Sequence, residues 1–255
     1  MGKNMRQLFI TIISLVFSFS LIAQPVGNQV REAMNSDIRT EAEKARDIYR
    51  KPDQVLTFFG LEEDMRVIEI MPFGGWYTKI LAPVLRDEGQ LYTTQPDLGQ
   101  YSAALDPTLE LTGMDRVIKL DYNSRAKNSP DERMIGPGGN WDVEPVDMVL
   151  TFQNYHNLQF DDRMALNEAA FNALKPGGVY GVVDHTRRHM QADEGFNRRR
   201  MDPVLVIEEV QAVGFELDGY SDALYMPDDD LTLEVGQPEV SGKSDRFVLR
   251  FRKPE

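Results

Sequence analysis

Two short segments of the chain carry the side chains best suited to proton transfer. The segment TFQNYHN (151–157) contains Tyr155 and His156, and the segment VVDH ends in Asp184 and His185. An imidazole titrates near neutral pH, so either histidine can take a proton from a bound molecule. Asp184 can orient His185, or the two can line a pocket together. These two histidines, Asp184 and Tyr155 are the predicted catalytic residues.

The same residues have two other interpretations. His156 can be a structural residue whose ring is satisfied by hydrogen bonds within the fold. His156, Asp184 and His185 can also supply three ligands to a metal ion, but their spacing matches no dedicated zinc motif. The chain has three histidines and no cysteine, which excludes thiol nucleophiles, thiolate metal sites and disulfides. No metal is predicted.

A second candidate site lies in the segment VIEIMPFGGWYTKILAP (67–83). An apolar strand is expected to end near Glu69, and a turn with Gly74 and Gly75 leads directly into an amphipathic helix. Glycine has no Cβ atom and tolerates positive φ, so its backbone can approach a ligand closely. The free N–H groups of the first helical turn point to the same side. This order of elements predicts a cofactor site, and an ordinary corner without a ligand is the alternative.

Strands and helices alternate along the chain and must hold these groups in place. Strands are predicted at 65–71, 90–95, 116–120, 146–151, 179–184, 215–219 and 246–251. Helices are predicted at 35–50, 52–59, 76–86, 163–174 and 203–213, and residues 121–141 are expected to form a loop or lid. This alternation indicates an α/β fold, a mostly parallel sheet with helices on both faces. The last two strands have no clear helix between them, which indicates an antiparallel pair at the sheet edge.

Five segments spread over the chain share a pattern with one enzyme superfamily. They are IYRKPDQVLTFFG (48–60), EIMPFGGWYTKILAP (69–83), VLTFQNYHN (149–157), LKPGGVYGVVDH (174–185) and SGKSDRFVLRFRKP (241–254). The chain resembles the class I S-adenosylmethionine-dependent methyltransferases, and most closely a branch of predicted exported bacterial methyltransferases. The resemblance implies a Rossmann-like fold with a seven-stranded sheet, S-adenosyl-L-methionine as cofactor, and methyl transfer to a small-molecule substrate.

The resemblance also implies which residues bind the cofactor. Glu69 is expected to face the ammonium group of the methionine end. The ribose is expected at Gln95 or Asp97, at the end of the second strand, and the adenine at Asp121. The predicted cofactor-binding residues are Glu69, Gly74, Gly75, Trp76, Tyr77, Gln95, Asp97, Asp121, Thr151 and Asn154.

Aromatic residues near the turn are expected to help or to hinder cofactor binding. Trp76, Tyr77 and Tyr155 are expected to form aromatic walls near the sulfonium. In contrast, Met71 and Phe73 occupy positions where the superfamily usually has glycine. If position 73 needs a left-handed backbone, a residue other than glycine costs roughly 1–2 kcal/mol. The ring of Phe73 is also expected to crowd the cofactor.

The first 23 residues have the features of an export signal, a short basic region followed by an apolar stretch and a small residue. An uncleaved membrane anchor is the alternative. The protein is therefore predicted to be exported, either periplasmic or secreted. Residues 24–255 are expected to form a single domain, with N-terminal helices at 24–60 and the α/β core at 61–255.

Export places the chain where S-adenosyl-L-methionine is not made. Together with Phe73 and Gln95, this favours two alternatives to the methyltransferase interpretation. In the first, a degenerate methyltransferase fold serves as an envelope protein that binds a small ligand. In the second, the histidine and aspartate residues carry out hydrolysis on the same scaffold.

The net charge of the chain limits the classes of partner that it can bind. The formal net charge is −13 at pH 7, and such an acidic body repels nucleic acid and anionic lipid. No nucleic-acid partner is predicted, and no membrane partner after signal cleavage. Arg187, Arg188 and residues 198–200 form a basic cluster, which is expected either to bind an anionic substrate group or to pair with surface acids. The sequence does not fix the oligomeric state.

Overall fold

The computed structural model describes residues 26–96, 102–124 and 136–255, so the predicted signal at 1–23 lies outside it. Its centre is a seven-stranded sheet with strand order β3-β2-β1-β4-β5-β7-β6. The strands are β1 (Arg66–Ile70), β2 (Gln90–Thr94), β3 (Ile118–Leu120), β4 (Val146–Phe152), β5 (Leu174–His185), β6 (Glu216–Ser221) and β7 (Arg246–Arg252). All neighbouring pairs are parallel except the two that involve β7. The predicted seven-stranded, mostly parallel α/β sheet is confirmed.

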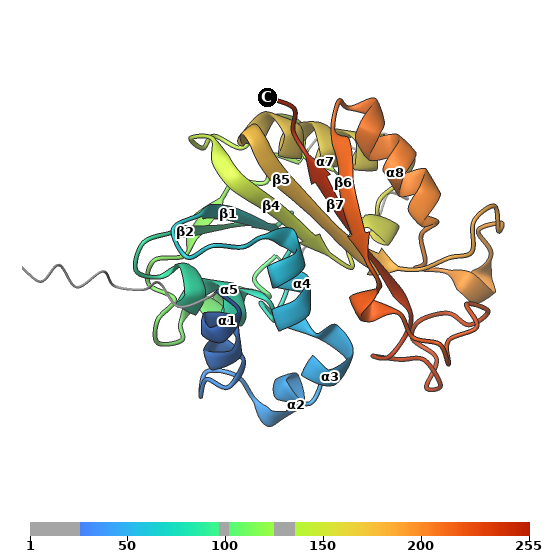
Figure 1. The fold of residues 1–255 in the computed structure, drawn as a ribbon, viewed down its shortest axis with the longest axis horizontal. Helices are drawn as coiled ribbons and strands as arrows, with labels where there is room; N and C mark the ends of the chain where they lie inside the picture. The colour runs from blue at the N-terminus through green and yellow to red at the C-terminus, as the bar shows by residue number, and fades with distance from the viewer. Residues whose placement is uncertain (1–25, 97–101, 125–135) are drawn as a thin grey trace, which may run out of the picture.

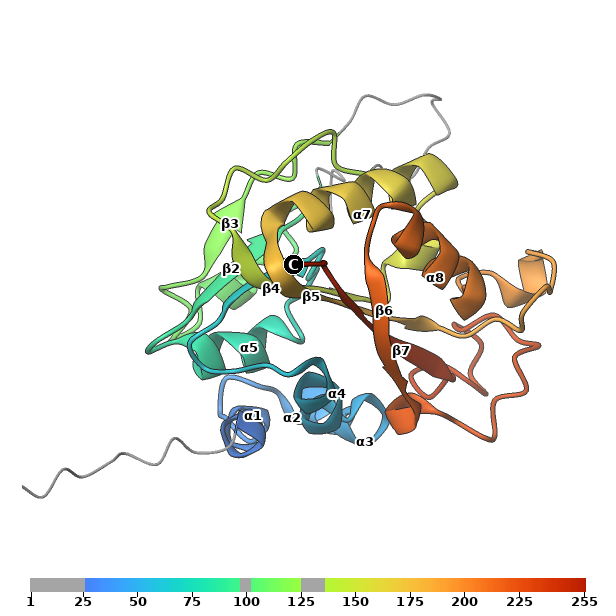
Figure 2. The same cartoon turned by 45° about the horizontal axis from the view of Figure 1, so that its top comes forward.

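Helices cover both faces of this sheet (Figures 1 and 2). One face carries α1 (Val26–Met34), α4 (Pro52–Phe59) and α5 (Thr78–Leu85), and the other carries α7 (Phe160–Ala173) and α8 (Pro203–Ala212). The shorter helices are α2 (Glu41–Lys44), α3 (Asp47–Arg50), α6 (Asp106–Leu109) and the 3-10 turns η2 (Tyr155–Asn157), η3 (Gly195–Asn197) and η4 (Asp222–Leu224). In the described ranges, no helix is both long and apolar enough to cross a bilayer.

Each face of the sheet has its own apolar cluster. Ile68 and Ile70 of β1 belong to the cluster beneath α7 and α8, and Val67 belongs to the cluster beneath α1, α4 and α5. Successive side chains of a strand point to opposite faces. The central strands are apolar on both faces because helices bury both.

The two last strands form an antiparallel pair at the sheet edge, as predicted, and β7 is the inner strand of this pair. It lies between β5 and β6, and its register runs from Val179 opposite Arg252 to His185 opposite Arg246. This position buries most of β7, including the side chain of Arg246, which is 3% exposed. A basic residue at the start of the last strand is thus held inside the fold.

The prediction of one helix over residues 35–50 was wrong. The chain forms α1 earlier, then α2 and α3 as two short helices separated by a turn. Thr40 is the N-cap of α2, and a capping box joins its side chain and backbone to Glu43. Lys51 then adopts a left-handed backbone with φ 37°, and Pro52 begins α4. The predicted start and end of α4, at Pro52 and Gly60, are confirmed.

Candidate active site

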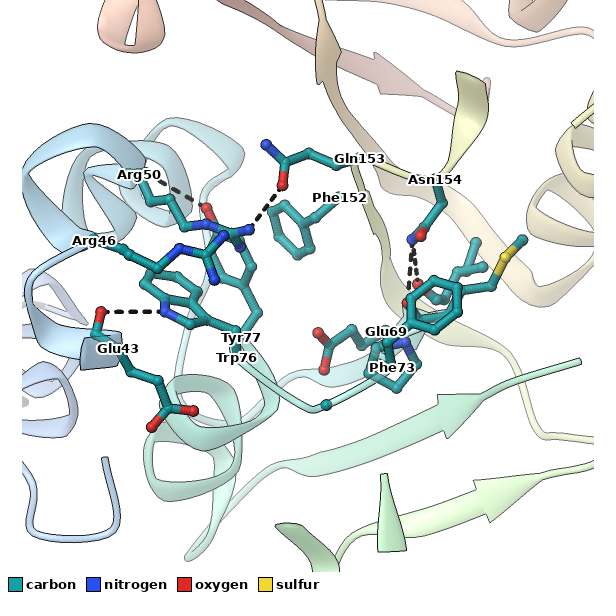
Figure 3. Close-up of a pocket in the computed structure, with 14 residues that line it drawn as sticks. Glu43, Arg46, Arg50, Glu69, Phe73, Trp76, Tyr77, Phe152, Gln153 and Asn154 are labelled. Atoms are coloured by element: carbon teal, nitrogen blue, oxygen red, sulfur yellow. Dashed lines mark hydrogen bonds between the residues drawn. The ribbon is translucent and has the colours of Figure 1, made fainter. Parts of the chain in front are cut away.

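A pocket of about 320 Å³ opens at the carboxyl ends of β1 and β4 (Figure 3). The strand order continues outward in opposite directions from this pair, through β2 on one side and β5 on the other. Ligands of open α/β sheets bind at such a reversal because the connecting segments diverge and leave a crevice. The lining comes from the turn after β1, the residues after β4, and the segment of α2 and α3. The volume lies in the range of small-molecule sites.

The turn after β1 contains three residues with left-handed backbone. Met71, Phe73 and Gly75 have φ values of 50°, 46° and 75°. Phe73 therefore has the left-handed backbone that was considered for this position from the sequence. For a residue other than glycine, this conformation costs roughly 1–2 kcal/mol of stability. The Phe73 N–H donates to Oε1 of Gln95 at 2.9 Å. Gln95, predicted to bind ribose, thus uses this oxygen to hold the strained turn.

The two glycines of the turn differ in their surroundings. A Cβ atom on Gly75 would lie 2.9 Å from the Leu105 side chain and 2.8 Å from the Thr108 side chain, so α6 and the residue before it require this glycine. Gly74 is exposed, lines the pocket, and has open space where a Cβ atom would be. Thr108 Oγ1 also donates to the Gly74 carbonyl at 2.9 Å. Only Gly74 faces a site for a ligand.

Glu69 is a buried carboxylate at the floor of the pocket. Its side chain accepts a hydrogen bond from Thr78 Oγ1 at 2.6 Å, and the residue is 2% exposed. Burial raises the pKa of Glu69 to about 7, although the Thr78 hydroxyl and the positive charge of Arg50 oppose this shift. Near neutral pH, a cation bound beside Glu69 would therefore draw it into its ionised form.

Arg46 and Arg50 also line the pocket, and neither is among the site residues predicted from the sequence. Arg50 donates to Oε1 of Gln153 at 2.8 Å. Burial lowers its pKa to about 9, so it stays charged at neutral pH. Their spacing is the sequence feature that could have identified them together, because residues four apart lie on the same side of a helical segment.

The ring of Trp76 and the ring of Tyr77 are already covered by protein groups. The guanidinium groups of Arg39 and Arg50 lie 4.8 Å and 4.6 Å from the centre of the Trp76 ring. Tyr77 stacks on Phe152 with ring centres 3.6 Å apart and planes at 10°. Both residues line the pocket, and these contacts compete for the ring faces, so it stays a prediction that the rings wall a sulfonium.

The predicted catalytic residues His156, Asp184 and His185 form a connected group that does not line the pocket. Asp184 accepts hydrogen bonds from the His156 N–H at 3.0 Å, His156 Nδ1 at 2.6 Å and the His185 N–H at 2.7 Å. Nδ1 of His185 pairs with Oγ of Ser244 at 2.7 Å, and burial lowers the pKa of His185 well below its usual range. Among the described residues, no three such side chains are arranged to hold a metal. The geometry favours the structural interpretation of His156, and the His185 ring is likewise held by a hydrogen bond within the fold.

Tyr155 points away from the pocket into the apolar cluster beneath α7 and α8. It is fully buried, donates to Oε2 of Glu209 at 2.9 Å, and accepts from Nδ2 of Asn167 at 2.8 Å. The η2 turn that follows β4 takes its side chain to that face. The predictions of Tyr155 as a catalytic residue and as an aromatic wall are both corrected.

The remaining predicted residues have separate positions. Asn154 lines the pocket and donates from Nδ2 to the carbonyls of Ile70 and Met71, at 3.0 Å and 3.3 Å, which fastens the end of β4 to the turn. Thr151 is fully buried beneath it. Asp121 is exposed and accepts the N–H of Asn123. Asp97 lies outside the described residues.

Three arginines of the basic cluster after β5 are paired with acids. The ion pairs are Arg187–Asp193, Arg199–Glu234 and Arg200–Asp229. This supports the interpretation that these arginines pair with nearby acids rather than with a substrate.

Comparisons with known proteins identify the fold. No family model and no curated protein matches the chain. An S-adenosylmethionine-dependent methyltransferase from Aquifex aeolicus has a TM-score of 0.55 at 14% identity, over 89% of this chain and 97% of that one. The chain has the class I methyltransferase fold.

Two further solved structures share this methyltransferase fold. The [4+2]-cyclase SpnF has a TM-score of 0.56 at 19% identity, over 86% of each chain. The glycopeptide N-methyltransferase MtfA has a TM-score of 0.53 at 13% identity, over 85% of this chain and 99% of that one. Identities this low establish a common architecture and not a common reaction.

Proposed function

We propose that the protein is an S-adenosyl-L-methionine-dependent methyltransferase that acts on a small molecule. The observation that carries this proposal is the position of the pocket, at the β1–β4 reversal of a methyltransferase fold and against the strained turn after β1. MtfA, which has this fold, has been solved in complex with S-adenosyl-L-methionine.

The residues present fit the methionine end of that cofactor. Glu69 offers a carboxylate to the ammonium group, and Gly74 offers open backbone beside it. Phe73 borders the pocket and leaves its volume of about 320 Å³ free, so the ring does not fill the site. Glu69, Gly74 and Asn154 are the residues that would hold the methionine end.

When bound, S-adenosyl-L-methionine supplies a methyl group activated by a positively charged sulfur. The task of the protein is then to align an acceptor with this methyl group and to exclude water. Phe73 and Phe152 give the pocket apolar surfaces for this purpose. No histidine is among the described lining residues, and Glu43 is paired with Lys79 at 2.8 Å. An acceptor that arrives already deprotonated suits such a pocket.

Calorimetric titration of the full chain with S-adenosyl-L-methionine and S-adenosylhomocysteine tests the proposal. We expect saturable binding of both ligands with micromolar dissociation constants, and a rise in melting temperature. The absence of heat and of a thermal shift at about 1 mM ligand would overturn it.

The two alternatives remain distinguishable by their products. SpnF, a cyclase, has the same fold, so the fold does not by itself determine the reaction. Incubation with candidate substrates gives a methylated acceptor for a transferase, a cleaved ligand for a hydrolase, and unchanged ligand for a binding protein. Export to the periplasm or beyond also stays a prediction, which N-terminal sequencing of the mature protein checks.

A further inference from the structure

Three arginines lie close together at one end of the pocket. Arg46 and Arg50 line the pocket, and Arg50 and Arg246 line a small neighbouring hollow toward β7 that has no room for a water molecule. Within the described ranges, none of these three forms an ion pair with an aspartate or a glutamate. Other well-buried arginines do form such pairs, namely Arg39–Asp47, Arg163–Glu209 and Arg200–Asp229. We call Arg46, Arg50 and Arg246 the basic end of the pocket.

Arg246 is the most buried member of the basic end. The residue is 3% exposed, and its Nε donates to the Ser244 carbonyl at 3.0 Å. Its Nη2 is buried and has no hydrogen-bond partner among the described residues. A buried donor left unsatisfied is costly, and a charged one more so. The hollow beside Arg246 has no room for a water molecule, so Arg246 adds its positive charge behind Arg50, and an anion contacts Arg46 and Arg50 in the open pocket.

The acids near the basic end have partners of their own. Asp229 and Asp245 act on the charge of Arg246, but Asp229 pairs with Arg200 and Asp245 accepts the Met226 N–H. The other residues of the neighbouring hollow are Tyr77, Phe152, Gln153, Val183 and Leu224, all uncharged near neutral pH. In the pocket itself, Glu43 is paired with Lys79. Glu69 is held near its midpoint of titration at neutral pH by burial. A positively charged sulfonium placed in this pocket would add to the excess of positive charge.

We propose that the basic end binds an oxyanion, a carboxylate or a phosphate, carried by the molecule that is methylated. The fork of a guanidinium matches the oxygens of either group. An anion at this position balances both the arginines and the sulfonium. The identification of the anion's carrier as the methyl acceptor rests on the proposed function, whereas the anion site itself does not.

The basic end is separate from the turn that would hold the cofactor's methionine end. Arg46 and Arg50 lie on the α2–α3 side of the pocket, and Glu69 and Phe73 lie across from them (Figure 3). An anion seated on Arg46 and Arg50 therefore lies across the pocket from Glu69 and Phe73 (Figure 3). Two ligands on opposite sides of the pocket should bind together, which gives the proposal its test.

The test is calorimetric titration of the full chain with inorganic phosphate and with benzoate, each without and with saturating S-adenosylhomocysteine. We expect at least one of these anions to bind, with affinities in the two states that agree within about threefold. The tighter of the two anions identifies the group that the acceptor carries. No anion binding to the free protein overturns the proposal. Displacement of the anion by S-adenosylhomocysteine, but not by 5′-methylthioadenosine, also overturns it, because the basic end then holds the cofactor's own carboxylate.

Matched variants locate the anion. Arg46→Met and Arg50→Met keep an apolar stem, and each is expected to weaken anion binding about tenfold or more. Arg252→Met is the control, since Arg252 pairs with Asp218 at the surface, away from the pocket; its anion affinity should equal that of the wild type. Equal affinities in all three variants would place the anion elsewhere and overturn the proposal. If phosphate binds but S-adenosylhomocysteine does not, the anion site stands and the methyltransferase proposal fails.

Discussion

Glu69 combines a buried carboxylate with one neutral hydrogen-bond donor, and this makes its protonation sensitive to pH. Its pKa is raised from 4.5 to about 7, chiefly by burial. Between these two values the folded chain keeps a proton that the unfolded chain has lost. The stability of the wild type should therefore fall as pH rises from about 4.5 to about 7. The ionised form is nevertheless the one that can pair with an ammonium group.

Replacing Glu69 by glutamine removes this titration. We expect Glu69→Gln to match the wild type near pH 4.5 and to be more stable above pH 7, by up to roughly 3 kcal/mol. Urea unfolding at several pH values measures the difference. Glu168→Gln, on the exposed side of α7, is the control and should show no such divergence. A constant difference between Glu69→Gln and the wild type at all pH values would contradict the prediction.

The same variant separates stability from binding. Ionised Glu69 is expected to hold the ammonium group, so the affinity of the wild type for S-adenosylhomocysteine should increase as pH rises through about 7. Glu69→Gln should bind more weakly and lose this pH dependence, although it is the more stable protein. Calorimetry at pH 6 and pH 8 measures both effects.

The sequence identifies the residues of the site that are local to one turn, and misses those that come from elsewhere. Glu69 and Gly74 follow from a strand, an acid and a glycine in close succession. Arg50 reaches the same pocket through a contact with Gln153, which is far away in the sequence. Tyr155 was assigned wrongly because a single 3-10 turn decides which face of the sheet it meets. Side-chain direction after a strand depends on tertiary packing, which residue types alone do not encode.

At the scale of elements, the turn after β1 gives a matched pair of substitutions. Gly75→Ala should destabilise the fold by more than 1 kcal/mol, because φ is 75° and the new methyl group would meet Leu105 and Thr108. Gly74→Ala meets nothing within 4 Å, so it should leave the stability nearly unchanged and weaken binding of S-adenosylhomocysteine. Thermal melts and calorimetry on both variants measure these effects. Equal loss of stability in the Gly74→Ala and Gly75→Ala variants would contradict this prediction.

The segment of α2 and α3 is held by one buried arginine. Arg39 donates to both carboxylate oxygens of Asp47, at 2.9 Å and 2.6 Å, and to the Met34 carbonyl at 2.6 Å. Arg39→Met should cost about 3–5 kcal/mol, because the aspartate loses its partner. It should also displace Arg50 and so weaken anion binding. Lys44→Met, which breaks only the surface pair with Glu41, is the control and should cost about 0.5 kcal/mol or less.

The long elements were predictable, and the short N-terminal helices were not. The α4 helix has Pro52 at its start and Gly60 at its end, and these two residues fix its bounds in the sequence itself. Helices of four residues, such as α2 and α3, are too short to show a helical period, and tertiary contacts decide whether they form. The capping box of Thr40 and Glu43 was the one local sign of where α2 begins.

At the scale of the whole molecule, one sheet carries two apolar clusters that do not share residues. The cluster beneath α7 and α8 contains Trp141, and the cluster beneath α1, α4 and α5 contains Trp76. The strands alternate between them, so loss of either cluster exposes one side of every central strand. We therefore expect the two clusters to unfold together, even though the N-terminal helices and the α/β core are separate parts of the chain.

The two tryptophans of the chain allow this cooperativity to be measured. Trp141→Phe leaves Trp76 as the sole reporter of the N-terminal layer, and Trp76→Phe leaves Trp141 as the reporter of the opposite layer. Each substitution shifts stability, so the fluorescence midpoint of each variant is compared with its own far-ultraviolet circular dichroism midpoint in urea. We expect the two midpoints to coincide in both variants, as two-state unfolding requires. An earlier fluorescence transition for Trp76 alone would show that the helices lining the basic end of the pocket unfold independently of the sheet.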